Sequence, residues 1–308
     1  MYIEKRYKQR ITLGQSDNTL VKLIAICLIV FVGLAFMKAV WYFTYQKELA
    51  LPLYYKNVLN LFTLPADYDQ LLSRPWTIIT QMFVHDNVWV VFANMLWLWS
   101  FGFIMQDLTG NNKIIPLFIY GSLAGAIAFI VSYNFAPSLR PLLPVATTMG
   151  ASAGVMSVAI ATTMVSPNYR LFPMIRGGMP LWILTVVYVL SHALTISPKD
   201  IAGIALHIAG GLTGFLFIYA YRKGYDLGAW MNDFFDWIGN LFNPNKPKKG
   251  KSIKEELFYK STSAPYKKTS NITQQRIDDI LDKINQQGYN FLTDEEKELL
   301  KRASKEDL

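Results

Sequence analysis

Cysteine and acidic residues are scarce in this chain of 308 residues. Cys27 is the only cysteine, so an intrachain disulfide and a cysteine metal site are both excluded. Between Asp107 and Asp200 the sequence has no aspartate or glutamate. That gap excludes carboxylate metal sites and two-carboxylate acid–base mechanisms there. It also disfavours proton- or cation-coupled transport, because such proteins usually keep a carboxylate at mid-membrane.

Apolar residues, by contrast, are abundant and gathered into long runs. The chain is 52% hydrophobic, with a mean hydropathy of +0.22. The runs are about as long as a helix that crosses a bilayer. The sequence therefore predicts an all-α polytopic membrane protein with six transmembrane helices, at residues 20–44, 82–105, 114–133, 151–166, 178–197 and 201–221.

The positions of lysine and arginine indicate how these spans are oriented. Most of them lie before the first run, between runs two and three, between runs four and five, and after run six. We therefore expect both termini in the cytoplasm, in agreement with the even number of spans. This bias also explains the net charge of +8. Because no nucleic-acid-binding module is visible, the expected contact of the basic residues is the lipid bilayer and no nucleic acid is expected as a partner.

Composition divides the chain into four segments. Only one of them holds the long apolar runs. Among the others are the polar stretch before the first span and a tail in which Ile277, Ile280, Leu281 and Ile284 recur at helical spacing. Gly288 ends that helix, and Thr293-Asp-Glu-Glu296 is a capping box for a second one. We expect a cytoplasmic leader at 1–19, a six-span core at 20–222, an interfacial helix and basic linker at 223–270, and a small cytoplasmic helical domain at 271–308.

A serine framed by glycines opens the fourth run, in the stretch Gly150-Ala-Ser152-Ala-Gly154. Glycine just before a helix permits a sharp turn, and the first helical N–H groups have no intrahelical partner. A serine there lies beside free donors that suit an oxyanion. The stretch also matches the Gly-x-Ser-x-Gly elbow of soluble hydrolases. That motif needs a preceding strand and a following acid, whereas here a proline-broken loop precedes it and apolar runs follow.

Three histidines are available to activate this serine, and His207 is the best placed of them. It lies six residues, or ~9 Å, into the sixth run from its outer end, at a depth that Ser152 can share. Glycine-lined helices approach more closely than leucine-lined ones, which brings a serine and a histidine within hydrogen-bond reach. The glycines expected to pack the helices together are Gly154, Gly203, Gly210, Gly211 and Gly214.

Each of these residues has a simpler interpretation. A serine in a span usually hydrogen-bonds the carbonyl four residues before it, and a histidine in a span can simply pack against a polar partner. Glycines at four-residue spacing are more often packing devices than markers of a site. We interpret the glycines here as both.

Together, these motifs resemble those of the rhomboid family of intramembrane serine proteases, over about residues 70–220. Gly150-Ala151-Ser152 looks like the family's nucleophile motif, and the stretch from His207 to Gly214 is similar to the H-x-x-G-x-x-x-G motif that carries the general base. The tail resembles a small cytoplasmic domain found after rhomboid cores in Bacteroidetes-type bacteria. Further similar stretches are Arg74-Pro-Trp76-Thr-Ile-Ile-Thr80, Phe83-Val-His85, Asn94-Met-Leu-Trp97-Leu-Trp99, Phe101-Gly102 and Asp107-Leu-Thr-Gly110.

The resemblance implies a Ser152–His207 dyad that cleaves transmembrane protein substrates near the outer face of a bacterial inner membrane. It assigns the oxyanion site and its support to Asn94, His85 and Gly150, and it needs no metal or cofactor. The chain departs from the family pattern at four positions. Val90 stands where many members have a histidine, Ala153 where glycine is common, Met156 where an aromatic residue often packs on the catalytic histidine, and Thr77 where arginine is frequent.

Two other functions stay open at this point. The loss of a histidine at position 90 favours a weak or inactive rhomboid-like pseudoprotease that binds membrane protein clients, whereas Ser152 and His207 favour an enzyme. A transporter or channel is disfavoured by the acid-free spans and by the lack of internal repeats. The sequence names no particular client and no oligomeric state.

Overall fold

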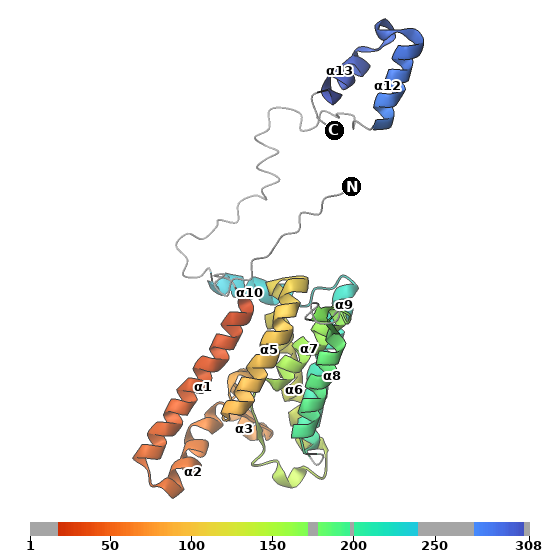
Figure 1. The fold of residues 1–308 in the computed structure, drawn as a ribbon. Coiled ribbons are helices and arrows are strands. Elements are labelled where there is room, and N and C mark those ends of the chain that lie inside the picture. Colours follow the sequence, from red (N-terminus) through yellow and green to blue (C-terminus); the bar gives the residue numbers. More distant parts are fainter. Residues whose placement is uncertain (1–17, 172–177, 198–199, 240–273, 305–308) are drawn as a thin grey trace. The chain divides into compact units, whose positions relative to one another are not determined.

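The computed structural model describes residues 18–171, 178–197, 200–239 and 274–304, which are mainly helical (Figure 1). The chain divides into two compact units, residues 1–242 and 243–308. Most of the expected leader and the expected basic linker beyond residue 239 lie outside the described residues.

Apolar helices make up the bundle of the first unit (Figure 1), in agreement with the all-α membrane fold predicted from the sequence. Four described helices are long and apolar enough to cross a membrane, namely α1 (Thr19–Thr44), α5 (Val88–Thr109), α6 (Ile114–Phe135) and α9 (Ile201–Arg222). The helices at the other two expected spans are α7 (Ser152–Val165) and α8 (Leu181–Thr195), which have 14 and 15 residues. At 1.5 Å per residue these two are ~21–23 Å long, less than the ~30 Å of a bilayer core.

The second apolar run becomes helical later than its composition predicts. Residues Gln81–Phe83 form a short 3-10 helix, η2, and α5 begins only at Val88. The Asn87 side chain caps α5, because its oxygen accepts hydrogen bonds from the N–H groups of Trp89 and Val90. An asparagine cap therefore sets the start of this helix and leaves the residues before it in a loop.

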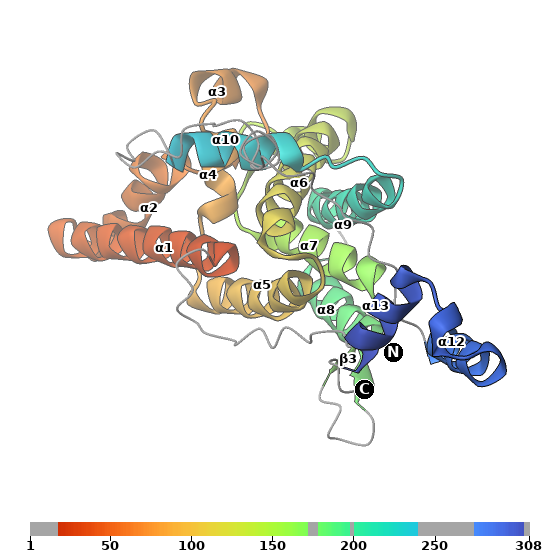
Figure 2. The same cartoon turned by 90° about the horizontal axis from the view of Figure 1, so that it is seen from above.

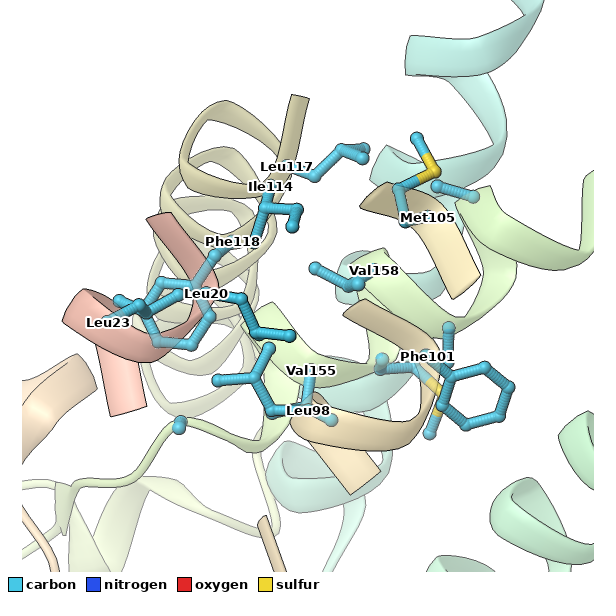
Figure 3. Packing of buried hydrophobic residues seen from close by; sticks show 14 of the residues in the cluster. Leu20, Leu23, Leu98, Phe101, Met105, Ile114, Leu117, Phe118, Val155 and Val158 are labelled. Carbon is cyan, nitrogen blue, oxygen red and sulfur yellow. The ribbon is translucent and has the colours of Figure 1, made fainter. Parts of the chain in front are cut away.

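The small-residue helix α7 is the centre of the bundle. Seen from above, it lies among α5, α6, α8 and α9, and it contacts all four (Figure 2). Nine of its 14 residues are buried, as expected for a helix that is enclosed by neighbours. Larger side chains fill the space between α7 and helices α1, α5 and α6 (Figure 3), including Leu20, Leu98, Phe101, Leu117, Phe118, Val155 and Val158.

The segment between α1 and α5 folds over one end of the bundle, at the end where α7 begins (Figure 1). A two-residue ribbon ties it to the loop before α7, since β1 (Leu64–Pro65) pairs antiparallel with β2 (Thr147–Thr148). The other elements of this loop region are short. Between α1 and α5 they are α2 (Lys47–Asn57), η1 (Leu59–Leu61), α3 (Tyr68–Ser73) and α4 (Thr77–Thr80), and the loop before α7 contains η4 (Arg140–Leu142). A second ribbon, β3 (Arg170–Leu171) with β4 (Met179–Pro180), precedes α8.

At the opposite end of the bundle, α10 (Ala229–Gly239) lies across the helix ends (Figures 1 and 2). Lys113 forms an ion pair with Asp226, and this hydrogen bond holds the pKa of Asp226 below its usual value. The Trp230 indole N–H donates to the Tyr120 hydroxyl over 2.6 Å. The segment that contains α10 is thus fastened to α6 and to the turn η3 (Asn111–Lys113) before it.

The second unit is a pair of helices, α12 (Gln274–Gln287) and α13 (Asp294–Ala303), joined through η5 (Tyr289–Phe291). Gly288 ends α12 with a φ of +90°, which glycine adopts readily. Of the expected apolar positions, Ile277 and Ile280 are buried and Ile284 packs against them. Leu281 differs, since its side chain is 47% exposed.

The capping box predicted for the second helix of this unit is present. Thr293 N–H donates to a Glu296 carboxylate oxygen over 2.8 Å, and Glu296 N–H donates to the Thr293 hydroxyl over 3.3 Å. Lys283 of α12 also binds the Glu296 carboxylate. These contacts hold the pKa of Glu296 below its usual value.

Candidate active site

The serine singled out from the sequence is the first residue of α7, and its side chain is half-buried. The chain turns into this helix at Gly150, which has a φ of +118° that other residues rarely adopt. The Gly150 N–H donates to the Gln81 carbonyl over 2.8 Å, which holds the turn against the loop before α5. Ser152 thus lies at a helix N-terminus, where the backbone N–H groups have no intrahelical acceptor.

His207 lies on α9, with one ring nitrogen bound and the other without a hydrogen-bond partner in the described part of the chain. Its Nδ1 atom is 2.7 Å from the Gly203 carbonyl oxygen, which can only accept, so Nδ1 carries the proton in this hydrogen bond. The Nε2 atom is buried and makes no hydrogen bond to the described residues. In this tautomer Nε2 has a lone pair directed away from its own backbone, as a general base requires.

The first turn of α9 is fixed by Asp200, which caps the helix. Its carboxylate accepts a hydrogen bond from the Gly203 N–H over 2.9 Å. A Cβ atom on Gly203 would lie only 2.3 Å from an oxygen of the same carboxylate. We expected Gly203 to pack against a neighbouring helix, but its nearest contacts come from the cap of its own helix. Its role here is to leave room for that cap.

Helices α7 and α9 approach backbone to backbone beside Ser152 and His207. A Cβ atom on Gly210 would lie 2.4 Å from the Ala153 carbonyl oxygen, and one on Gly214 would lie 2.1 Å from the Ser157 carbonyl oxygen. Contacts this short leave no space for any side chain at either position. Since Ala153 follows Ser152 directly, this contact places the first turn of α7 against the helix that carries His207.

The other two glycines make different contacts. A Cβ atom on Gly154 would lie 2.7 Å from the Phe118 carbonyl oxygen, so this glycine seats α7 on α6. One on Gly211 would lie 3.5 Å from side-chain atoms of Met156 and Ile160, which is an ordinary contact distance. Only Gly211 among these positions has room for a methyl group.

Asn94 and His85 form a buried pair on the other side of the turn before Ser152. The Asn94 side-chain nitrogen is 3.2 Å from His85 Nε2, and the Ala151 N–H donates to the same Nε2 over 3.3 Å. His85 Nδ1 is 3.2 Å from the Phe83 carbonyl, so Nδ1 carries the proton and Nε2 accepts. In this tautomer His85 holds two donors in place and has no N–H of its own left for a ligand.

Position 90, where the sequence departs from the family pattern, contributes no polar group here. Val90 lies one turn before Asn94 on α5, and its side chain is 51% exposed, whereas Asn94 is 2% exposed. The side-chain amide of Asn94 has two N–H groups, of which His85 takes one. The second is available to a ligand.

Two residues near His207 were not assigned a role from the sequence. Asp200 precedes an apolar run directly, and an acidic residue in that place is a common helix cap, so this signal was available. His192 of α8 packs its ring against that of His207, with the ring centroids 5.0 Å apart. No spacing rule relates side chains on two different helices, and only the structure brings this pair together.

The arrangement as a whole suits acyl transfer through a serine. It offers a hydroxyl at a helix N-terminus, a buried imidazole with one free nitrogen on the adjacent helix, and an amide N–H for a developing negative charge. The hydrogen bond between Ser152 and His207 is not formed in this structure, since Nε2 has no partner. Within the described residues, no three His, Cys, Asp or Glu side chains are grouped to bind a metal ion.

Comparison with known proteins finds a matching family for each of two parts of the chain. Residues 72–224 match the rhomboid domain, and residues 264–306 match a family of unknown function, DUF6576. The chain is 26% identical over 178 residues to rhomboid protein 1, mitochondrial, of Saccharomyces cerevisiae. That alignment covers 56% of this chain and 49% of the yeast protein, so the chain spans about half the length of this relative. With its helical membrane core and this domain match, the chain is a rhomboid family protein.

Proposed function

We propose that this chain is an intramembrane serine protease that uses Ser152 as nucleophile and His207 as general base. The observation that carries the proposal is the His207 ring. Its Nδ1 is bound to the Gly203 carbonyl, and its Nε2 is buried without a partner among the residues that the structure describes. The helix that carries it contacts the first turn of α7 backbone to backbone. A histidine that served only packing would have no need for an unpaired buried nitrogen, which is costly.

In the proposed reaction, Nε2 of His207 takes the proton of the Ser152 hydroxyl as its oxygen attacks the carbonyl carbon of the scissile peptide bond. The C–N bond then breaks, the amine leaves with the proton from His207, and the acyl group stays on Ser152. A water molecule, deprotonated by the same imidazole, hydrolyses that ester and restores the serine. The Gly203 carbonyl holds the Nδ1 proton throughout and stabilises the imidazolium that forms, in the place that a carboxylate takes in a triad.

The negative charge on the carbonyl oxygen is held by the Ser152 backbone N–H and by the second N–H of Asn94. His85 supports this site without contacting the oxyanion. Its Nε2 orients the Asn94 amide and binds the Ala151 N–H just before the nucleophile. Removal of a single oxyanion donor typically costs ~10²–10³ in kcat. On this basis we expect Asn94→Ala, which removes one donor, to lower kcat by ~10²–10³.

We further propose that α7 and α8 complete a six-span core in a bacterial inner membrane, with both termini in the cytoplasm. Neither helix contains Asp, Glu, Lys or Arg. The distribution of basic residues supports the orientation. Ser152 then faces the outer side, at the end of the bundle where residues 45–80 fold, and the substrates are transmembrane proteins cut near that face.

Cleavage of a transmembrane reporter in proteoliposomes tests the proposal directly. The wild type should cut the reporter and react with a fluorophosphonate probe, whereas Ser152→Ala and His207→Ala should do neither. His207→Ala must also be checked for folding by its thermal unfolding. If wild type and Ser152→Ala label equally, the enzyme is not a serine protease.

The second candidate is a rhomboid pseudoprotease that binds membrane protein clients. Two observations favour it: Val90 offers no polar group, and the Ser152–His207 hydrogen bond is absent. Catalytic hydrogen bonds are often long before substrate binds, which limits the weight of the second observation. A pseudoprotease should retain a crosslinked client in Ser152→Ala and in the wild type alike, with no cleavage product in either.

A further inference from the structure

Resting on the proposed function, we infer that His192 of α8 is a positioning residue that fixes the plane of the His207 ring. The two imidazole rings have centroids 5.0 Å apart and planes inclined by 42°. This lies within the range in which aromatic rings attract one another. Among the described residues, the ring contact of His207 comes from α8 and not from α7.

His192 is itself held by a column of rings that reaches into the core. Tyr188, one turn earlier on α8, packs edge-on against His192 with centroids 4.7 Å apart. Tyr188 is fully buried and contacts Trp97 and Phe101 of α5 at 5.1 Å and 5.6 Å. Since Phe101 is also fully buried, the column has a rigid base. The position of His192 is therefore set by the core.

A second contact on His207 is needed because one hydrogen bond cannot fix a ring. The bond from Nδ1 to the Gly203 carbonyl fixes one atom and leaves the imidazole able to tilt about it. The His192 ring, packed against it at an angle of 42°, limits that tilt. Gly203 and His192 together thus direct Nε2. Met156 of α7, which would lie 3.5 Å from a Cβ on Gly211, one turn after His207, has no ring to offer. Small errors in the direction of a general base lower kcat strongly.

The other side chains of α8 are poorly placed to orient the His207 ring. Several of its apolar side chains are exposed on the bundle surface, and Leu190 is 56% exposed. Its contacts run mainly to α7, through a hydrogen bond between Thr163 and Thr185. The contact of α8 with His207 is therefore made by His192, which Tyr188 supports.

The test compares three variants of the full chain in proteoliposomes. His192→Leu removes the ring, His192→Phe keeps a flat ring without nitrogen, and Leu190→Ala changes an exposed residue two positions away. We expect His192→Leu to lower kcat about three- to tenfold with little change in KM, because a ring pair contributes a modest free energy. His192→Phe should restore most of the rate, and Leu190→Ala should match the wild type.

A spectroscopic measurement separates this inference from the proposed function. With three histidines in the chain, ¹⁵N-histidine NMR resolves His207 individually. Its ring signals should shift and broaden in His192→Leu but not in Leu190→Ala, whether or not the protein cleaves a reporter. The inference is overturned if His207 signals are unchanged in His192→Leu, if kcat is unchanged, or if His192→Phe is as slow as His192→Leu. If no serine is labelled in the wild type while the His207 signals do respond, the proposed function fails and the positioning contact stands.

Discussion

Replacing Gly210 by alanine adds one methyl group at the closest approach of α7 and α9. The new Cβ would lie 2.4 Å from the Ala153 carbonyl oxygen, and Cβ atoms essentially never come within 3.0 Å of a heavy atom outside their own stretch of chain. The helices must therefore separate by about 0.6 Å, the difference between these two distances. Because the obstacle is backbone, no side chain can rotate away to relieve the clash.

This separation should reduce both stability and rate. Overpacking of a tight interface costs ~1–3 kcal/mol of the free energy of unfolding. A displacement of ~1 Å at reacting groups can cost ~10² in rate, so we expect kcat of Gly210→Ala to fall tenfold or more. The measurement is kcat on a transmembrane reporter, together with thermal unfolding in the same detergent.

Gly211→Ala is the matched control, one residue further along the same helix. Its Cβ would meet side-chain atoms at 3.5 Å, so it fits without movement of either helix. It should also gain up to ~1 kcal/mol of helix propensity over glycine. If Gly210→Ala and Gly211→Ala have equal kcat and equal unfolding temperatures, the backbone contact does not position the dyad and the reasoning is refuted.

Three further predictions concern two features near the site and one helix cap in the C-terminal unit. Asp200→Ala should destabilise the start of α9 by ~1 kcal/mol and lower kcat, because the Gly203 carbonyl that holds His207 would lose its fixed position. Asp200→Asn can still cap the helix and should retain the stability and the kcat of the wild type. Equal losses in the two variants would contradict this. Gly150→Ala should cost ~1–3 kcal/mol in thermal unfolding from its φ of +118° alone, and an unchanged unfolding temperature would exclude backbone strain there. Because the pKa of Glu296 is lowered on folding, its contribution to the C-terminal helices is complete above the usual carboxyl pKa and is lost as pH falls through the lower folded value. Methyl NMR of the intact chain should show that the midpoint pH of this acid unfolding differs between Glu296→Gln and the wild type. Identical pH profiles in the two proteins would contradict the prediction.

Much of the membrane core could be predicted from the sequence, because apolar length and charge bias are strong local signals. Where the second run becomes helical could not, since hydropathy does not register the Asn87 cap or the 3-10 turn before it. The bounds of α7 and α8 were predicted more closely, since the apolar runs at 151–166 and 178–197 form helices at Ser152–Val165 and Leu181–Thr195.

The site was predictable as a set of residues but not as a geometry. Ser152 and the glycines carry local signals, whereas the tautomer of His85 depends on the Phe83 carbonyl and on two donors from distant segments. Gly203 shows how one pattern can have two causes. Its four-residue spacing suggests a helix contact, yet the space above it is taken by Asp200.

The attachment of α10 to α6 has a mechanical consequence for the C-terminal unit. The chain leaves α9 at Arg222, is fastened by the Lys113–Asp226 ion pair and the Trp230–Tyr120 hydrogen bond, and only then continues towards residue 243. A displacement of the chain beyond α10 would therefore meet these two contacts before it reached α9. The chain after α9 is thus attached to α6 and η3, and not only to the helix that carries His207.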